Sequence, residues 1–144
     1  MSVGFCSALR LEEYVLNGVS VEGEWVVERD LLYFSKAGDW YMVPKGFITD
    51  LASIPKPLRG LIEVNGKHRK AAVLHDYLYC SQMLARKDAD ALFLEAMELL
   101  GVSTLQRNVM WLGVRAGGGL YWNKRTSPED TIQDFVPDSY FTAA

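Results

Sequence analysis

The chain has 144 residues, of which 49% are apolar and 12% are aromatic, and its mean hydropathy is zero. A chain of this size and composition can bury a substantial core, which excludes disorder over the whole length and predicts a single domain. The net charge of −3 and the pI near 5.4 argue against a protein that mainly grips nucleic acid, because that task needs a basic surface. We therefore expect no specific nucleic-acid partner.

Signals for export or membrane insertion are missing from the sequence. No stretch approaches the roughly 18 apolar residues needed to span a bilayer, and the start from Met1 to Phe5 lacks the basic flank and apolar run of a signal peptide. We expect a protein that is neither transmembrane nor secreted by a signal peptide. Cys6 and Cys80 lie too far apart in sequence to form a disulfide framework or a cysteine metal cage, so both are predicted to be reduced, buried thiols.

The first half of the chain has the composition of β-strands. Short aromatic and β-branched runs, separated by turn-forming residues, occupy Glu24 to Glu28, Leu31 to Phe34 and Trp40 to Val43. These runs predict a small antiparallel sheet. The following segment, Phe47 to Pro57, has two prolines in three residues, which disfavour both a helix interior and a central strand. We expect an ordered loop there.

The second half has helical periodicity. The pattern predicts three helices, at Arg69 to Gln82, at Asp88 to Leu100 with Asp88 as N-cap, and from a capping box at Ser103 toward Arg115. The run Gly117 to Gly119 is expected to interrupt or end the third helix through close packing or a turn. The predicted fold class is α+β, with a small N-terminal antiparallel sheet packed with a C-terminal bundle of about three helices.

The first predicted helix carries a second patterned face besides its core stripe. Ala72, His75, Asp76 and Tyr79 follow the spacing i, i+3, i+4, i+7 and place polar groups on one side. A helical hairpin would bring Asp90, at the start of the next helix, back toward this face. We therefore predict a hydrogen bond between His75 and Asp90, with the histidine partly accessible from a cleft.

Three interpretations of this polar face are open. His75 could act as an acid–base catalyst with Asp90 and Tyr79, the same groups could be structural polar packing, or they could bind a metal. His68 is expected in an exposed basic approach to the helix, and a zinc site made from His68, His75 and Asp76 would lack the usual ligand spacings.

Two further polar residues lie in the proline-rich segment. Asp50 and Ser53 are predicted to form an Asx-type turn and its partner, and the alternative is that both line the same pocket as His75.

Three motifs together resemble a known family. They are Phe47 to Pro55, Ala71 to Tyr79, and the set Arg86, Ala89-Asp90 and Phe93. Over roughly residues 40 to 122 the chain resembles a family of short proteins of unknown function that tailed bacteriophages and prophages encode. The resemblance implies a phage or prophage protein associated with the tail or head of the virion. Its expected location is the virion or the bacterial host cytoplasm, and its expected partners are other virion proteins or further copies of itself.

A second, shorter motif resembles an enzyme active site. The spacing of His75, Asp76 and Tyr79, followed by Asp90 and Phe93, is similar to the core of secreted phospholipases A2 and of the phospholipase domain in parvovirus capsid proteins. The resemblance implies His75 as general base, Asp76 as a Ca²⁺ ligand, Tyr79 as support and Asp90 as the group that orients the histidine. It further implies Ca²⁺-dependent acyl hydrolysis. An anionic lipid is a possible partner for another reason: the basic side chains of residues 56 to 70 could face a phospholipid headgroup or the acidic tail, or they could form a solvated face. The glycine-rich calcium loop and the disulfides of those enzymes are missing here.

Charge is distributed unevenly between two segments. Residues 56 to 70 carry five basic side chains and the single acid Glu63, whereas residues 126 to 144 combine four acids with aromatic side chains and two prolines. The second segment is too apolar for a free end and too short for a core of its own. We predict one domain over residues 1–144, with 126–144 as a tail that docks either on this domain or on a neighbouring subunit.

Overall fold

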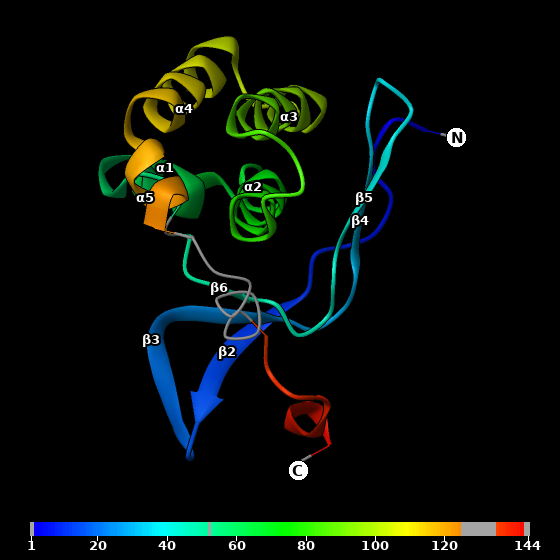
Figure 1. Ribbon diagram of the computed structural model, residues 1–144, viewed down its shortest axis with the longest axis vertical. Helices are drawn as coiled ribbons and strands as arrows, with labels where there is room; N and C mark the ends of the chain where they lie inside the picture. Colours follow the sequence, from blue (N-terminus) through cyan, green and yellow to red (C-terminus); the bar gives the residue numbers. More distant parts are fainter. Residues whose placement is uncertain (1, 52, 125–134, 143–144) are drawn as a thin grey trace.

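The structure is a computed structural model that describes residues 2–51, 53–124 and 135–142. It confirms the α+β class, because the strands lie in the first half of the chain and the long helices in the second (Figure 1). Among these residues, no helix has both the length and the apolar character required to cross a membrane.

The strands form two antiparallel three-stranded sheets rather than the single sheet expected. The first has the order β1-β4-β5 and consists of β1 (Gly4–Phe5), β4 (Leu31–Phe34) and β5 (Trp40–Val43). The second has the order β2-β3-β6 and consists of β2 (Leu11–Leu16), β3 (Val19–Val27) and β6 (Ile48–Thr49). The bounds of β4 and β5 match the prediction. The second sheet was not expected, because β2 and β6 carry little hydrophobic alternation of their own.

The helices are α1 (Lys56–Asn65), α2 (Arg69–Ser81), α3 (Arg86–Leu99), α4 (Thr104–Gly117) and α5 (Gly119–Lys124), followed by the 3₁₀ helix η1 (Asp138–Phe141). Helix α1 starts inside the segment predicted as a loop. Pro55 is its N-cap and Pro57 lies in its first turn, where a proline removes no helical hydrogen bond, so the two prolines start a helix instead of preventing one.

The helix ends follow local sequence signals in most places. Ser103 caps α4 by accepting a hydrogen bond from the backbone N–H of Gln106 at 3.2 Å, as the capping box predicts. Helix α3 differs, because its N-cap is Ala85 and Asp88 lies in the first turn instead. There the Asp88 carboxylate still faces the positive end of the helix dipole.

The glycine run separates α4 from α5 as expected. A Cβ atom on Gly118 would lie 2.6 Å from the hydroxyl oxygen of Tyr79 on α2, so only glycine allows this close approach. Gly118 therefore sets how closely the end of α4 packs on α2.

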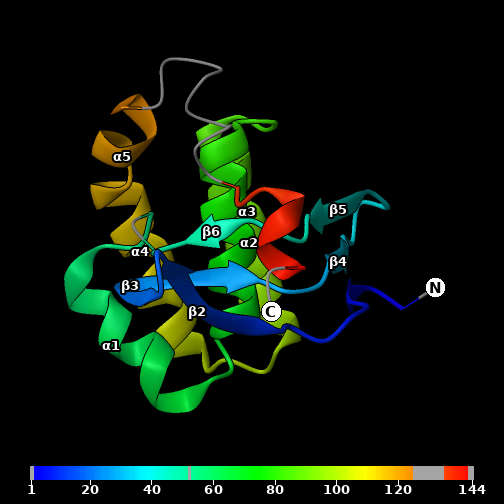
Figure 2. The ribbon, with the colours of Figure 1, turned by 90° about the horizontal axis from the view of Figure 1, so that it is seen from below.

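Helix α2 is the central element of the fold. It contacts α1, α3, α5, β5 and β6, and Figure 2 shows it beside α3 in the middle of the molecule. Both faces that the sequence predicts for this helix are buried. The buried residues of α2 are Ala71, Ala72, Val73, Leu74, His75, Asp76, Leu78, Tyr79 and Cys80. Of the two cysteines, Cys80 is buried as predicted. Cys6 is exposed, contrary to the prediction, because it directly follows the short edge strand β1.

The described part of the C-terminal segment contacts the sheets. Phe135 forms an isolated bridge with Phe47, and the Val136 N–H donates to the Gly46 carbonyl at 2.9 Å. The Tyr140 hydroxyl accepts a hydrogen bond from the Val15 N–H at 3.0 Å. Residues 126–134 of the predicted tail lie outside the described residues, so the docking of the whole segment stays a prediction.

Candidate functional site

His75 and Asp90 meet at the packed interface of α2 and α3. The Nε2 atom of His75 lies 2.7 Å from Oδ1 of Asp90, which confirms the predicted hydrogen bond. The predicted access from a cleft is wrong, because both side chains are 0% exposed. The imidazole is enclosed by two rings, with centroid distances of 4.3 Å to Tyr79 and 4.5 Å to Phe93.

The Asp90 carboxylate accepts hydrogen bonds from three side chains. Besides His75, the Tyr79 hydroxyl donates to Oδ1 at 2.6 Å, and Nη1 of Arg115 donates to Oδ2 at 2.7 Å. Nη1 of Arg86 lies 3.7 Å from the same Oδ2 and adds a second positive charge. The sequence indicates Arg86 through its i, i+4 spacing with Asp90. Arg115 lies on α4, and no sequence spacing relates it to Asp90, so the sequence does not predict its place in the cluster.

The other ring nitrogen of His75 contacts the proline-rich segment. Ser53 Oγ lies 3.1 Å from Nδ1, so of the two candidates in that segment Ser53 joins the cluster. Asp50 is exposed, and its negative charge contributes to the raised pKa of Asp76. The predicted Asx-type turn at these two residues stays a prediction.

Asp76 forms a second, adjoining group of hydrogen bonds. Thr49 Oγ1 donates to Oδ2 at 2.7 Å, and the Ser53 backbone N–H donates to Oδ1 at 3.3 Å. Because Ser53 contacts both Asp76 and His75, the two groups form one network, which we call the His75 network: Thr49, Ser53, His75, Asp76, Tyr79, Asp90 and Arg115.

Burial and hydrogen bonding fix the charge states of the central pair. Burial lowers the pKa of His75 below its ordinary value, so the imidazole is neutral near pH 7. Burial raises the pKa of Asp90, but the hydrogen bonds from His75, Tyr79 and Arg115 outweigh this and hold the pKa below the usual value. A neutral imidazole that donates from Nε2 to the carboxylate must accept at Nδ1, which matches a hydroxyl donor on Ser53.

The surroundings of Asp76 do not fit the Ca²⁺ site that the phospholipase resemblance implies. Both carboxylate oxygens already accept hydrogen bonds, the side chain is 1% exposed, and burial raises its pKa to about 6. Calcium needs six to eight oxygen ligands. Within the described ranges, no group of three or more His, Cys, Asp or Glu side chains could hold a metal ion. Binding of Ca²⁺ at Asp76 therefore stays a prediction that this geometry does not support.

His68 is buried rather than exposed, which corrects the sequence expectation. It is 0% exposed, and neither ring nitrogen has a hydrogen-bond partner in the described part of the chain. Burial and the neighbouring charge of Lys67 lower its pKa, which keeps the ring neutral. The ring therefore behaves as part of the core, and it shares no hydrogen bond with the His75 network.

Comparison with known proteins identifies a family but no activity. No curated protein and no solved structure matches the chain. A family model described as "Protein of unknown function (DUF1353)" matches residues 25–114, which is more than half of the chain. The matched span contains Ser53, His75, Asp76, Tyr79 and Asp90. The chain therefore belongs to the DUF1353 family.

Proposed function

We propose that this protein is a non-catalytic structural component of a tailed-phage or prophage particle, located in its tail or head. The phage assignment rests on the resemblance of the motifs Phe47 to Pro55 and Ala71 to Tyr79 to the phage-encoded family. In this proposal, the His75 network is a structural device that holds helices of the domain in one arrangement. Partners are other particle proteins or further copies of the chain.

The observation that carries the non-catalytic role is the complete satisfaction of a buried cluster. Both ring nitrogens of His75 and both oxygens of Asp90 have partners from this chain, and the two side chains are 0% exposed. A general base must come within hydrogen-bond reach of a substrate proton. Because His75 is 0% exposed and Ser53 is 1% exposed, a substrate in solvent does not come within reach of either ring nitrogen.

The same network explains what these polar residues do for the fold. Asp90 on α3 is bonded to α2 through His75 and Tyr79, to α4 through Arg115, and through His75 to the segment before α1 that holds Ser53. A buried carboxylate is stable only with its partners in place, so one arrangement of these four segments is favoured over others.

A hydrolase is the second candidate, because a specific geometry favours it. Ser53, His75 and Asp90 form a hydroxyl–imidazole–carboxylate chain with contacts of 3.1 Å and 2.7 Å. In hydrolases such a chain activates the hydroxyl as a nucleophile. In that case Ser53 would attack an acyl group and His75 would take its proton. The Ca²⁺-dependent phospholipase A2-like enzyme is a separate form of the hydrolase candidate, in which His75 would activate a water instead of Ser53 and Asp76 would hold the metal. Ser53 is 1% exposed, so the residue has almost no contact with solvent, which disfavours this candidate.

Complementation of a phage that lacks the gene distinguishes the two candidates. Ser53→Ala removes the hydroxyl but keeps the backbone N–H that binds Asp76, so a structural role predicts a cost of about 1 kcal/mol and normal yields of infectious particles. Ser81→Ala is the matched control on α2, because the Ser81 hydroxyl is buried without a partner within the described residues. Equal yields with both variants support the structural component.

A folded Ser53→Ala protein that fails to restore infectivity, while Ser81→Ala succeeds, would establish the hydrolase instead. Particle association has its own readout, which is mass spectrometry of particles purified from the complemented lysate. Detection of the chain at a fixed copy number per particle is expected. Its absence from purified particles would refute the assignment to the virion.

A further inference from the structure

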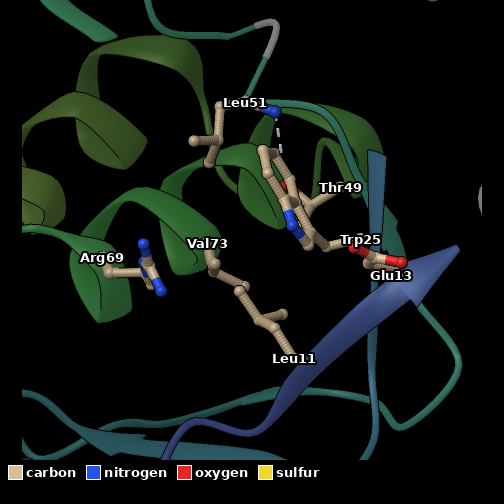
Figure 3. Close-up of a pocket in the computed structure, with 7 residues that line it drawn as sticks. All are labelled: Leu11, Glu13, Trp25, Thr49, Leu51, Arg69 and Val73. Atoms are coloured by element: carbon tan, nitrogen blue, oxygen red, sulfur yellow. Dashed lines mark hydrogen bonds between the residues drawn. The ribbon is translucent and has the colours of Figure 1, made fainter. Parts of the chain in front are cut away.

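A cavity of about 440 Å³ lies between the second sheet and the N-terminal end of α2 (Figure 3). The sheet side is one cross-strand row, since Glu13 of β2 pairs with Trp25 of β3 and Trp25 pairs with Thr49 of β6. On the helix side, Arg69 and Val73 are one turn apart on α2. The volume falls in the range of roughly 300–1,000 Å³ that is typical of small-molecule sites.

The middle of the cavity is apolar and its ends are charged. Figure 3 shows Trp25 and Val73 in the middle, with Arg69 and Glu13 on opposite sides. The remaining apolar wall consists of Leu11 and Leu51. Because the charges lie at the ends, an occupant could bury an apolar body and keep a polar head near one end.

Arg69 is the unused positive charge of this cavity. Its guanidinium forms no hydrogen bond or ion pair with any of the described residues. As the first residue of α2 it lies at the positive end of the helix dipole, and this helix has neither an acidic residue in its first turn nor a side-chain cap. Glu13, at the other side, is held at Oε2 by the Ser20 hydroxyl at 2.8 Å. The free cationic group is therefore at the Arg69 end.

The wall next to the His75 network is conformationally strained. Leu51 has φ of +59°, in the left-handed region that a leucine rarely adopts, and its N–H lies 3.4 Å from Oγ1 of Thr49. Thr49 in turn donates to the buried Asp76. Strained residues of this kind often occur at ligand sites, where the surrounding structure holds them in place.

We infer that the cavity between Arg69 and Trp25 binds a small amphipathic carboxylate, with its apolar body against Trp25, Val73 and Leu51 and its carboxylate on the guanidinium of Arg69. An arginine can hold a carboxylate through two parallel hydrogen bonds. Glu13, on the opposite side of the cavity, disfavours an anionic group at the far end of the ligand, so a ligand with one carboxylate and an uncharged tail is preferred over a dicarboxylate. This binding site goes beyond the structural role proposed above and does not depend on it.

Calorimetric titration with matched ten-carbon probes tests this site. Decanoate, decanedioate, decanol and decylammonium share a ten-carbon chain and differ only in the groups at its ends. Each is titrated below its micelle concentration into the full chain and into variants. We expect decanoate to bind at least tenfold more tightly than the other three.

Two variants and one control variant locate the binding to the cavity. Arg69→Gln should weaken decanoate at least tenfold and leave the weak binding of decanol unchanged, whereas Lys67→Gln, at an exposed cation outside the cavity lining, should change neither. Leu11→Trp should reduce the affinity for every probe by filling the space, and its melting temperature shows whether it is folded. Equal decanoate affinity in the wild type and in Arg69→Gln, tighter binding of decylammonium, or no binding of decanoate would each overturn the assignment.

Discussion

Helix α2 carries two polar regions that differ in whether their side chains have partners within the described part of the chain. His75, Asp76 and Tyr79 lie in a network whose buried donors and acceptors are matched within the chain. Arg69, about two to three turns earlier, keeps its charge unpaired among the described residues beside an open cavity. The first region has the residue types of an active site and the burial of a core, and the second has ordinary residue types and the geometry of a ligand site.

The difference shows that residue type alone does not locate a functional site. A buried His–Asp pair with complete hydrogen bonding stabilises the fold, because any movement would leave a desolvated charge without its partner. An unpaired cation beside an apolar hollow can gain a partner when a ligand arrives. Four substitutions or deletions test this contrast.

Asp90→Asn is expected to have the largest effect. An amide has only one acceptor oxygen, so it cannot accept from both His75 and Arg115 as the two carboxylate oxygens do. The guanidinium of Arg115 also loses the negative charge that it faces. We expect a loss of about 2–4 kcal/mol in the free energy of unfolding, measured by urea denaturation. Asp88→Asn is the matched control, since Asp88 is exposed in the first turn of the same helix and should cost less than about 1 kcal/mol. Equal costs for the two variants would mean that the network does not stabilise the fold.

Asp76→Asn should change the pH dependence of stability. Burial raises the pKa of Asp76 from 3.8 to about 6 in the folded protein. The folded state therefore holds the proton more tightly than the unfolded state, and the stability from this group is present below about pH 4 and lost as the pH rises to about 6. At about 1.36 kcal/mol for each unit of pKa, the loss is about 3 kcal/mol.

Urea denaturation of the wild type and of Asp76→Asn between pH 4 and pH 7 measures the contribution of Asp76 to the free energy of unfolding. The stability of the variant relative to the wild type should increase by about 2–2.5 kcal/mol over that interval, which is most of the full effect. A difference between the two proteins that is constant with pH would show that the folded-state pKa of Asp76 is not raised.

Deletion of residues 127–144 tests where the C-terminal segment docks. Val136 is 8% exposed and Phe135 contacts the Phe47 ring at a centroid distance of 5.7 Å. Removal of these contacts should cost about 2 kcal/mol, seen as a lower urea midpoint for a protein that stays folded. Unchanged stability together with failure to enter particles would instead indicate docking on a neighbouring subunit. A deletion without either effect would contradict both forms of docking.

Gly118→Ala is expected to have the smallest of the four effects. Its Cβ would lie 2.5 Å from the carbonyl oxygen of Val114 and 2.6 Å from the hydroxyl of Tyr79, so the end of α4 must move and Tyr79 must shift from Asp90. We expect a loss of about 1–2 kcal/mol. Gly60→Ala, which meets no atom within 4 Å inside α1, should instead gain about 0.5–1 kcal/mol. A neutral Gly118→Ala would show that this contact is easily relaxed.

Local patterns were sufficient for much of the fold. The strands at Leu31–Phe34 and Trp40–Val43 have the predicted bounds, and the cap at Ser103 forms as expected. Helix α1 was missed because the two prolines were interpreted only as helix breakers, although proline is well placed in a first helical turn. The helical hairpin was enough to predict that His75 and Asp90 meet.

The rest of the site depends on tertiary structure. Burial of His75 needs Ser53 and Phe93 in place around it, and Arg115 reaches Asp90 from α4. The cavity is assembled from β2, β3, β6 and α2, so no single segment carries a motif for it. Periodicity within one element cannot show which side chains from distant elements close a space or leave it open.

The protonation state of His75 is the most direct test of the closed, structural network. ¹⁵N NMR of the imidazole reports tautomer and charge, and the His75→Gln variant assigns the signals because His68 is the only other histidine. We predict a ring that is neutral at pH 7 with the proton on Nε2, and that titrates below the ordinary range of a histidine, because burial lowers its pKa and Asp90 accepts from Nε2. A ring that titrates near pH 6.5 and exchanges its proton rapidly with solvent would contradict this, since an accessible, titrating His75 is what a catalytic base requires.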